Sequence, residues 1–274
     1  ATPIPRSLAL TLYGDMNVSF LDEFPPGRKP IETQLFYEKN REVAYSLLEK
    51  EIKQGRQAYV VCPLIEESEF IDLKAAIDVY NELNNTRFPD LTIQLIHGKL
   101  KREERQKIMA EFKNGEIDVL VSTTVIEVGI DVPNATIMLI EQAERFGLAQ
   151  LHQLRGRVGR GKHASKCLLI ACHALTENGK ARLKAIVESR DGFAIAEEDL
   201  RIRGPGDFTG TRQSGMPLLR AGNLLRDIKL LELSRLEAVD LIEKDPKLET
   251  PENKILKNTL QRILGDNMNL MKII

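Results

Sequence analysis

The sequence predicts an α/β fold, a doubly wound parallel sheet followed by a helical extension. From residue 31 to about 174, short β-branched apolar segments alternate with segments whose apolar residues recur at helical spacing. Continuous apolar strands are typical of a parallel sheet, because helices cover both of its faces. Past residue 175 this alternation ends. Right-handed crossovers make a doubly wound sheet the expected topology.

The expected elements follow one another in a regular order. An extended, proline-containing start and a strand within residues 13–23 precede a linker at 25–30 (PPGRKP). Strands are predicted at 34–37 (an edge strand), 58–62, 92–96, 118–122, 136–141 and 167–171. Helices are predicted at 42–54, 70–83, 102–113, 147–154, 180–188 and 194–203. Gly55 and the Asn114-Gly115 pair are expected to end helices.

Composition excludes few functions. The 274 residues carry 39 Lys and Arg against 40 Asp and Glu, so a nucleic-acid surface would have to be a local patch. No apolar run approaches the roughly 20 residues of a membrane span, and we expect a cytoplasmic protein. Cys62, Cys167 and Cys172 lie in apolar runs and are expected to be reduced and buried. The Cys172-His173 pair lacks a second ligand pair, so no metal site is predicted.

Distinctive polar residues follow three of the predicted strands. Ligands of such sheets bind beyond the carboxyl ends of the strands, so we expect the site there, built from segments 97–99, 123–131 and 146–161. In the last segment, QLHQLRGRVGRG (150–161) sets arginines among glycines. Arginine binds phosphate oxygens bidentately, and glycine lets the backbone approach an anion. A solvated, basic helix start is the alternative.

The run from Gln153 to Arg160, QxxGRxGR, resembles motif VI of the superfamily 2 helicases. The resemblance implies a second RecA-like lobe, of the P-loop NTPase type, that faces ATP held by a first lobe. Arg157 and Arg160, with Gln153, would then be catalytic as arginine fingers that stabilise charge on the transferred phosphoryl group. Gly156 would lie at the nucleotide.

The segment VLVSTTVIEVGIDVPNAT resembles motif V of the same helicases. By that resemblance, Thr123 or Thr124 would meet a DNA phosphate at a helix N-terminus. Gly129 would allow a close approach to the nucleotide, and Asp131 would accept hydrogen bonds from the ribose hydroxyls. A cap or turn residue before the following Val-Pro pair is the alternative reading of Asp131.

The His97-Gly98 pair resembles a strand-tracking element of the family, which implies a DNA contact. A satisfied interior histidine is the alternative for His97.

Residues 200–215, LRIRGPGDFTGTRQSG, resemble the TRG motif of the RecG and transcription-repair coupling helicases, and the part RGPGDFTGTRQSG matches the RecG form. A Gly-Pro-Gly turn makes this segment a loop with presented cations, and an ordinary basic surface loop is the alternative. In the family, a helical hairpin and this loop convert lobe closure into DNA translocation. Arg201, Arg203 and Gln213 are therefore the expected coupling residues.

The resemblance also implies a domain division. The opening ATPIPRSLAL resembles the end of motif III, so residues 1–30 would be the end of a first lobe and a linker. The second lobe would span 31–175, the TRG hairpin and loop 176–230, and a helical tail 231–274. The rest of the first lobe and a junction-splitting wedge domain would lie outside these residues.

One segment imitates an ATP-binding loop. Residues 156–162 have the glycine spacing and lysine of a Walker A motif, but His163 replaces the Ser or Thr, and the preceding pattern is helical. No DExH box is present either. ATP and Mg²⁺ would therefore be held mainly by the first lobe, and the isolated chain is expected to be inactive.

The sequence thus resembles the carboxyl-terminal part of a RecG-type ATP-dependent DNA helicase. The full-length parent, for which a monomer is the simplest state, would translocate on double-stranded DNA and remodel forks and Holliday junctions in recombination and repair. A transcription-repair coupling translocase and a non-catalytic nucleic-acid binding module are the alternatives.

Overall fold

The computed structural model describes residues 29–63, 69–123, 131–203 and 227–264. These residues belong to two compact units, one within 29–203 and the other within 227–264. Within these ranges, no helix is both long and apolar enough to cross a membrane. The predicted motif III, the first strand and most of the linker lie outside the described residues, as does the TRG loop.

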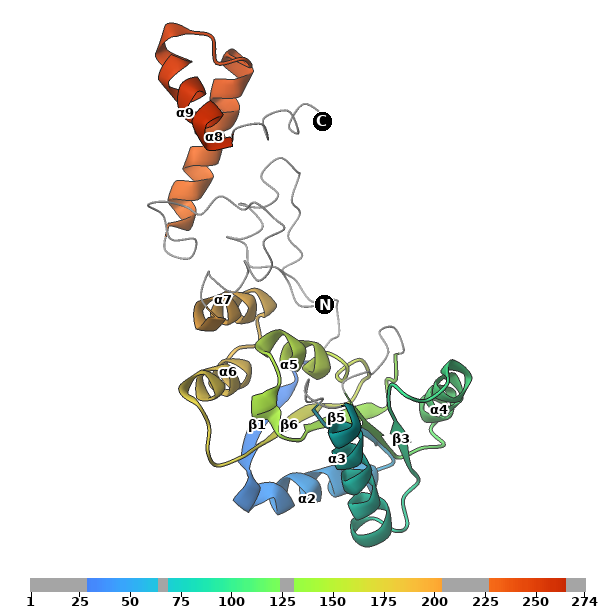
Figure 1. Ribbon diagram of the computed structural model, residues 1–274. Helices are drawn as coiled ribbons and strands as arrows, with labels where there is room; N and C mark the ends of the chain where they lie inside the picture. The colour runs from blue at the N-terminus through green and yellow to red at the C-terminus, as the bar shows by residue number, and fades with distance from the viewer. Residues whose placement is uncertain (1–28, 64–68, 124–130, 204–226, 265–274) are drawn as a thin grey trace. The chain divides into compact units, whose positions relative to one another are not determined.

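The first unit is built on a parallel sheet (Figure 1). Among the described residues this sheet has six strands in the order β1-β6-β5-β2-β4-β3, and every neighbouring pair is parallel. The strands are β1 (Glu32–Tyr37), β2 (Gln57–Val61), β3 (Ile93–Ile96), β4 (Val119–Ser122), β5 (Ala135–Ile140) and β6 (Lys166–Ala171). The predicted parallel sheet is confirmed, and β1 is the predicted edge strand.

Helices cover both faces of the sheet. Tyr59 and Val60 are neighbours on β2 and belong to opposite cores, because successive strand residues point to opposite faces. One core includes α2 (Arg41–Ile52) and α3 (Glu69–Glu82), which cover one face of the sheet. The other includes α4 (Arg102–Asn114), α5 (Leu148–Arg155) and α6 (Glu177–Glu188), with α7 (Gly192–Arg203) packed on α5 and α6. The doubly wound expectation is confirmed.

Local residues explain where several helices begin and end. Gly115 has a φ of 83° and closes α4, as the Asn-Gly pair predicts. The Thr176 hydroxyl accepts a hydrogen bond from the Gly179 amide at 3.1 Å, so α6 begins at Glu177, earlier than predicted. Short helical turns occupy Glu38–Asn40, Leu83–Arg87 and Ala143–Arg145.

The second unit contains two helices among its described residues. These are α8 (Ile228–Lys244) and α9 (Lys254–Leu264), joined through a short 3-10 turn at Pro251–Asn253. The Asp245 carboxylate closes the connection by accepting hydrogen bonds from the amides of Glu249 and Thr250 and from the Asn253 side chain, at 2.9–3.0 Å. The predicted helical tail is confirmed in this part of the chain.

Packing and the predicted domain division differ in one respect. Helices α6 and α7 contact α5 and share its core, so they belong to the same compact unit as the sheet. Residue 175 is therefore no packing boundary, and the division at that point stays a prediction. The thiols differ as well: Cys62 and Cys167 are buried as expected, whereas Cys172 is half-buried.

Candidate functional site

The arginine run, residues 155–161, begins at the last residue of α5. Leu148, Leu151 and Leu154 point from α5 into the core, which leaves Gln153 exposed on the opposite side. Gly156 caps the helix with ordinary α-helical angles. Beyond it, Arg157 is half-buried and Arg160 is exposed. The helix predicted before the run is confirmed, and the strand that a Walker A loop requires is not there.

The glycines of the run contact protein rather than an open anion site. A Cβ at Gly159, whose φ is 76°, would come within 2.8 Å of the Ile31 side chain. A Cβ at Gly161 would come within 2.2 Å of the Pro133 carbonyl oxygen. Only glycine fits either position without movement. These contacts hold the arginine run against the start of β1 and the loop before β5.

Close packing at Gly161 brings Asp131 and Arg160 together. Arg160 Nε lies 3.8 Å from Asp131 Oδ1 and donates to the Gly156 carbonyl at 3.4 Å. Beneath them, burial raises the pKa of Tyr59 to about 12, a rise that Asp131 reinforces and that Arg157 and Arg160 oppose. The predicted motif V aspartate and motif VI arginines therefore share one neighbourhood around Tyr59.

The position of this cluster corrects one expectation. Asp131 and Pro133 precede β5, which starts at Ala135, so the arginine cluster lies toward the amino end of β5. We expected it at the carboxyl ends of the strands. Helix α5 starts beyond the carboxyl end of β5 and leads the chain back across the sheet before β6 begins. The arginines that follow α5 therefore lie toward the amino ends of the strands.

Arg155 differs from the other arginines of the run. It is only 5% exposed, and its Nη1 donates to the carbonyls of Ile186 and Ser189 at 2.9 and 2.8 Å. Burial lowers the pKa of its guanidinium. Arg155 thus fastens α5 to the carboxyl end of α6.

The predicted DNA-contacting residues lie at the carboxyl ends of the strands, opposite the arginine cluster. The Thr123 amide donates to the Ile96 carbonyl at 3.3 Å, which places Thr123 beside His97 at the carboxyl ends of β4 and β3. Thr123 is buried and its amide is used by the sheet, so its N–H is not open to a phosphate. Gly98 is exposed with open space around its Cα. Thr124 and Gly129 lie outside the described residues.

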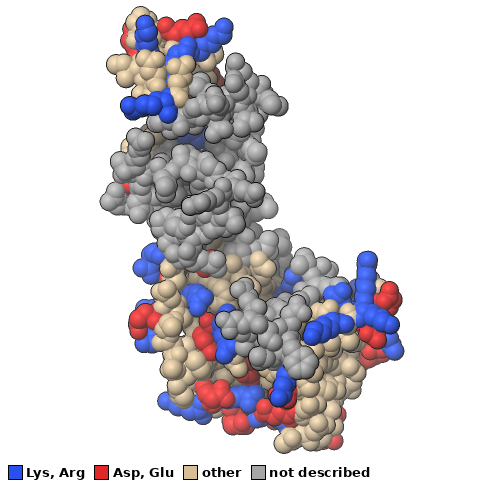
Figure 2. Space-filling model, in the orientation of Figure 1, with Lys and Arg blue, Asp and Glu red and all other residues tan. Residues whose placement is uncertain are grey.

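His97 is half-buried, and burial, followed by the charge of Lys99, lowers its pKa. Its Nδ1 is enclosed and has no hydrogen-bond partner among the described residues. In the same region, Figure 2 shows Lys and Arg side chains projecting at α4, with acidic side chains between them. This surface is mixed in sign, in keeping with the near-zero net charge.

The coupling residues are partly described. Arg201 is exposed on α7 and pairs with Glu198, with Nε 2.8 Å from the carboxylate. Arg203 is the last residue of α7, but its side chain and the whole of Gln213 lie outside the described residues.

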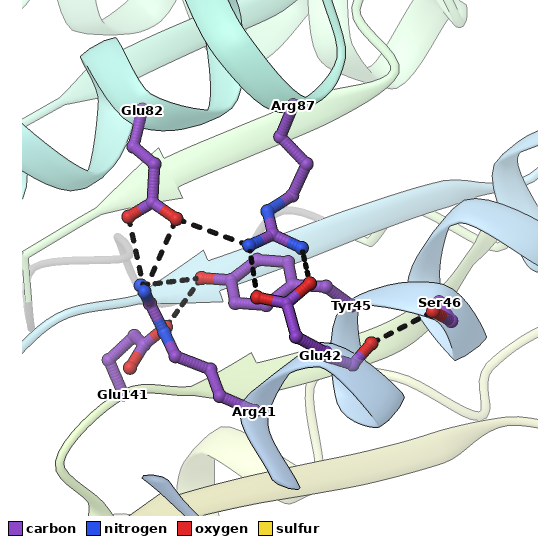
Figure 3. Close-up of polar contacts among 7 residues, drawn as sticks. All are labelled: Arg41, Glu42, Tyr45, Ser46, Glu82, Arg87 and Glu141. Carbon is purple, nitrogen blue, oxygen red and sulfur yellow. Dashed lines mark hydrogen bonds and ion pairs between the residues drawn. The ribbon is translucent and has the colours of Figure 1, made fainter. Parts of the chain in front are cut away.

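The sequence did not reveal a polar network at the carboxyl end of β5 (Figure 3). Glu141 accepts hydrogen bonds from the Tyr45 hydroxyl and from Arg41, whose Nη2 lies 3.1 Å away. Arg41 also pairs with Glu82 at 3.2 Å, and the Arg87 guanidinium lies 4.5 Å from the centre of the Tyr45 ring. Burial raises the pKa of Glu141, and Arg41 opposes the rise.

Every charged group in this network has a partner, which indicates a structural role. It joins α2, α3 and the end of β5, just before the turn that leads into α5. The signal available in the sequence was the Arg41–Tyr45 spacing, because residues four apart lie on one helix face.

Comparisons with known proteins agree with this arrangement. Residues 39–162 match the family described as helicase conserved C-terminal domain, and residues 189–274 match ATP-dependent DNA helicase RecG, domain 3, C-terminal. The chain is 51% identical over 267 residues to the RecG helicase of a Synechocystis strain, covering 97% of this chain and 32% of that protein. It is 50% identical over 260 residues to the Bacillus subtilis protein of the same name, covering 95% of this chain and 38% of that protein.

A solved structure of RecG bound to a three-way DNA junction gives a TM-score of 0.66 at 47% identity, covering 84% of this chain and 30% of that one. The chain thus spans about a third of the length of the relatives it matches. The two family matches lie in succession, and the identity extends over nearly the whole chain. This chain therefore corresponds to the carboxyl-terminal part of the RecG-type helicases, with their second RecA-like lobe.

Proposed function

We propose that this chain is the second motor lobe and carboxyl-terminal region of an ATP-dependent translocase that moves on double-stranded DNA and remodels branched DNA. The observation that carries the proposal is the grouping of Arg157, Arg160 and Asp131 around Tyr59. The names of the relatives support it, as does the three-way junction bound by the RecG of the similar solved structure.

The arginines fit a nucleotide phosphate. Arg160 meets Asp131 at 3.8 Å in an exposed pair, which is a weak interaction in water. Arg157 has no ion pair among the described residues. Both guanidiniums are therefore available to an anion, and Asp131 remains an acceptor for ribose hydroxyls. Gln153, exposed on the same helix end, would orient the same groups.

ATP supplies the phosphoryl group whose charge spreads over its oxygens during transfer. In this proposal, Arg157 and Arg160 stabilise that charge as fingers from the second lobe, and the phosphate loop and the Mg²⁺ ligands belong to a first lobe. The described residues contain no group of three acidic, His or Cys side chains that could hold a metal.

A physical link from the arginines to the α6–α7 hairpin supports coupling. Arg155 shares the arginine run and is bonded to the carbonyls at the end of α6. Helix α7, which carries Arg201 and ends at Arg203, packs on both α5 and α6. A displacement of α5 on lobe closure would therefore move the hairpin, and with it the TRG loop that contains Gln213.

DNA would lie at the carboxyl ends of the strands in this proposal. His97 and Gly98 follow β3 there, and Gly98 leaves the backbone open to a phosphate. The half-buried His97 would be neutral near pH 7, because its pKa is lowered, and would contact DNA as a hydrogen-bonding group. A cytoplasmic location, together with the chromosome, belongs to the same proposal.

The first test is ATP hydrolysis by the 274-residue chain, with and without a three-way DNA junction, beside a longer protein that includes the first lobe. We expect turnover only in the longer protein, stimulated by the junction. Turnover by the shorter chain that survives rigorous purification would contradict the lobe assignment, and a longer protein indifferent to DNA would contradict the translocase.

A further inference from the structure

A small cavity lies beneath the carboxyl end of α5. Its volume is about 160 Å³, and it is bounded by the residues just before β1, by α5 and by the α6–α7 connection, with one side open to solvent. The side chains that give it its charge are Lys29, Arg155 and Arg190, and His152 also lines it. Pro30, Ile31 and Gly156 complete the described lining, so no carboxylate faces the cavity from these residues.

Arg155 makes this cavity more than a surface hollow. Its side chain is nearly fully buried, yet only Nη1 has hydrogen-bond acceptors among the described residues, the two carbonyls at the end of α6. A guanidinium offers five N–H donors, and a buried one is normally paired with a carboxylate. Here the neighbouring charge is Arg190, a second cation.

We propose that this cavity binds an oxyanion of the phosphate class. Lys29, Arg155 and Arg190 are permanent cations that face one space, and Arg and Lys are the side chains that bind phosphate oxygens. The cavity volume corresponds to about five water molecules, enough for one phosphate group. The anion would compensate the buried charge of Arg155.

This site adjoins the predicted ATP-facing cluster through Gly156 but shares none of its charged side chains. Arg157, Arg160 and Asp131 do not line the cavity, whose charged side chains face α6 and the start of β1. The anion can come from two sources, a phosphate of the DNA backbone or a free phosphate ion. The DNA source rests on the function proposed above, and the free-ion source does not.

The experiment uses the 274-residue chain and inorganic phosphate. The variants are Lys29→Gln and Arg190→Gln, whose side chains are exposed, singly and combined, because Arg155 also holds α5 to α6. Lys113→Gln, an exposed lysine at the end of α4, is the matched control for lost charge. Thermal midpoints are compared in phosphate and in chloride at equal ionic strength.

Phosphate should raise the midpoint of the wild type and of Lys113→Gln, because a ligand that binds only the folded state stabilises it. The rise should be partly lost in each single variant and absent in the double variant. In a second arm, duplex DNA is titrated at several salt concentrations. If the DNA backbone supplies the anion, the slope of log K against log salt should fall by about two in the double variant.

A phosphate response with an unchanged DNA slope identifies the free ion as the source, and the site stands. A lowered slope without a phosphate response identifies DNA, provided that Lys113→Gln keeps the wild-type slope. Two outcomes overturn the proposal: a double variant that equals the wild type in both arms, and a wild type that responds to neither probe. Neither result touches the ATP assignment, which is measured by hydrolysis.

Discussion

Gly161 packs directly on the carbonyl of Pro133, at a distance where a Cβ would lie 2.2 Å from the oxygen. The contact joins the end of the arginine run to the loop that carries Asp131. Two segments that are distant in the chain thereby form one site, and its integrity depends on the absence of a side chain at residue 161.

Gly161→Ala should destabilise the first unit. The added methyl group meets backbone, which cannot move aside as a flexible side chain can, so we expect a loss of about 1–3 kcal/mol in the free energy of unfolding. Chemical denaturation measures it. Gly98→Ala is the matched control, because nothing lies within 4 Å of its added Cβ, and it should stay within about 0.5 kcal/mol of wild type. Equal stability of both variants would contradict the close packing.

Arg160→Ala, made in a longer protein with both lobes, should lower DNA-stimulated ATP hydrolysis by about 10³-fold or more, as the loss of an arginine finger does. Arg157→Ala should act in the same direction. DNA affinity should stay close to wild type, because neither side chain lies near His97, at the carboxyl ends of the strands. An equal loss of DNA binding and hydrolysis would count against the finger assignment.

Arg203→Ala should reduce unwinding of branched DNA more than it reduces ATP hydrolysis. The reason is the position of Arg203 at the end of α7, on the hairpin that packs against α5. Arg201→Ala should act in the same direction, because Arg201 is also an expected coupling residue and its exposed pairing with Glu198 is a weak interaction in water. Parallel loss of both activities in Arg203→Ala would remove the coupling role.

The α8–α9 connection should lose stability in acid through Asp245. Hydrogen bonds from Asn253 and from the Glu249 and Thr250 amides hold the pKa of its carboxyl well below the ordinary value. A lowered folded-state pKa gives stability that is present above the unfolded pKa of about 4 and is lost as the pH falls further. Amide NMR signals of Glu249 and Thr250 should therefore shift only well below pH 4. Asp245→Asn should remove this acid transition; if it remains, another group causes it.

Cys172 should be the first thiol to react with an alkylating reagent. Burial raises the pKa of Cys62 and of Cys167 to about 12 each, and both are enclosed, so their thiolates are scarce and inaccessible. Cys172 is half-buried, and Glu144 raises its pKa, so the reaction should be slow. Mass spectrometry after labelling of native protein at pH 8 should find one modified site, and Cys172→Ser should remove it. Labelling of Cys167 in native protein would contradict its burial.

Much of the fold follows from local patterns. Apolar strands, helical spacing and residues such as Gly115 specify each element through neighbouring residues, so those boundaries agree with the predicted ones within a few residues. The start of α6 differs because its cap, Thr176, lies before the apolar residues that reveal the helix. The motif VI resemblance leads to Arg157 and Arg160 for the same reason, since the motif is a continuous segment.

The alternation of strands and helices, and the segments that resemble helicase motifs, can be recognised from the order of residues along the chain. Three contacts could be found only in the folded chain: Arg160 with Asp131 toward the amino end of β5, Arg155 with the carbonyls at the end of α6, and Gly161 with Pro133. These contacts join segments that are distant in the sequence. Their geometry depends on strand order and on the path of α5 across the sheet, which no local periodicity encodes.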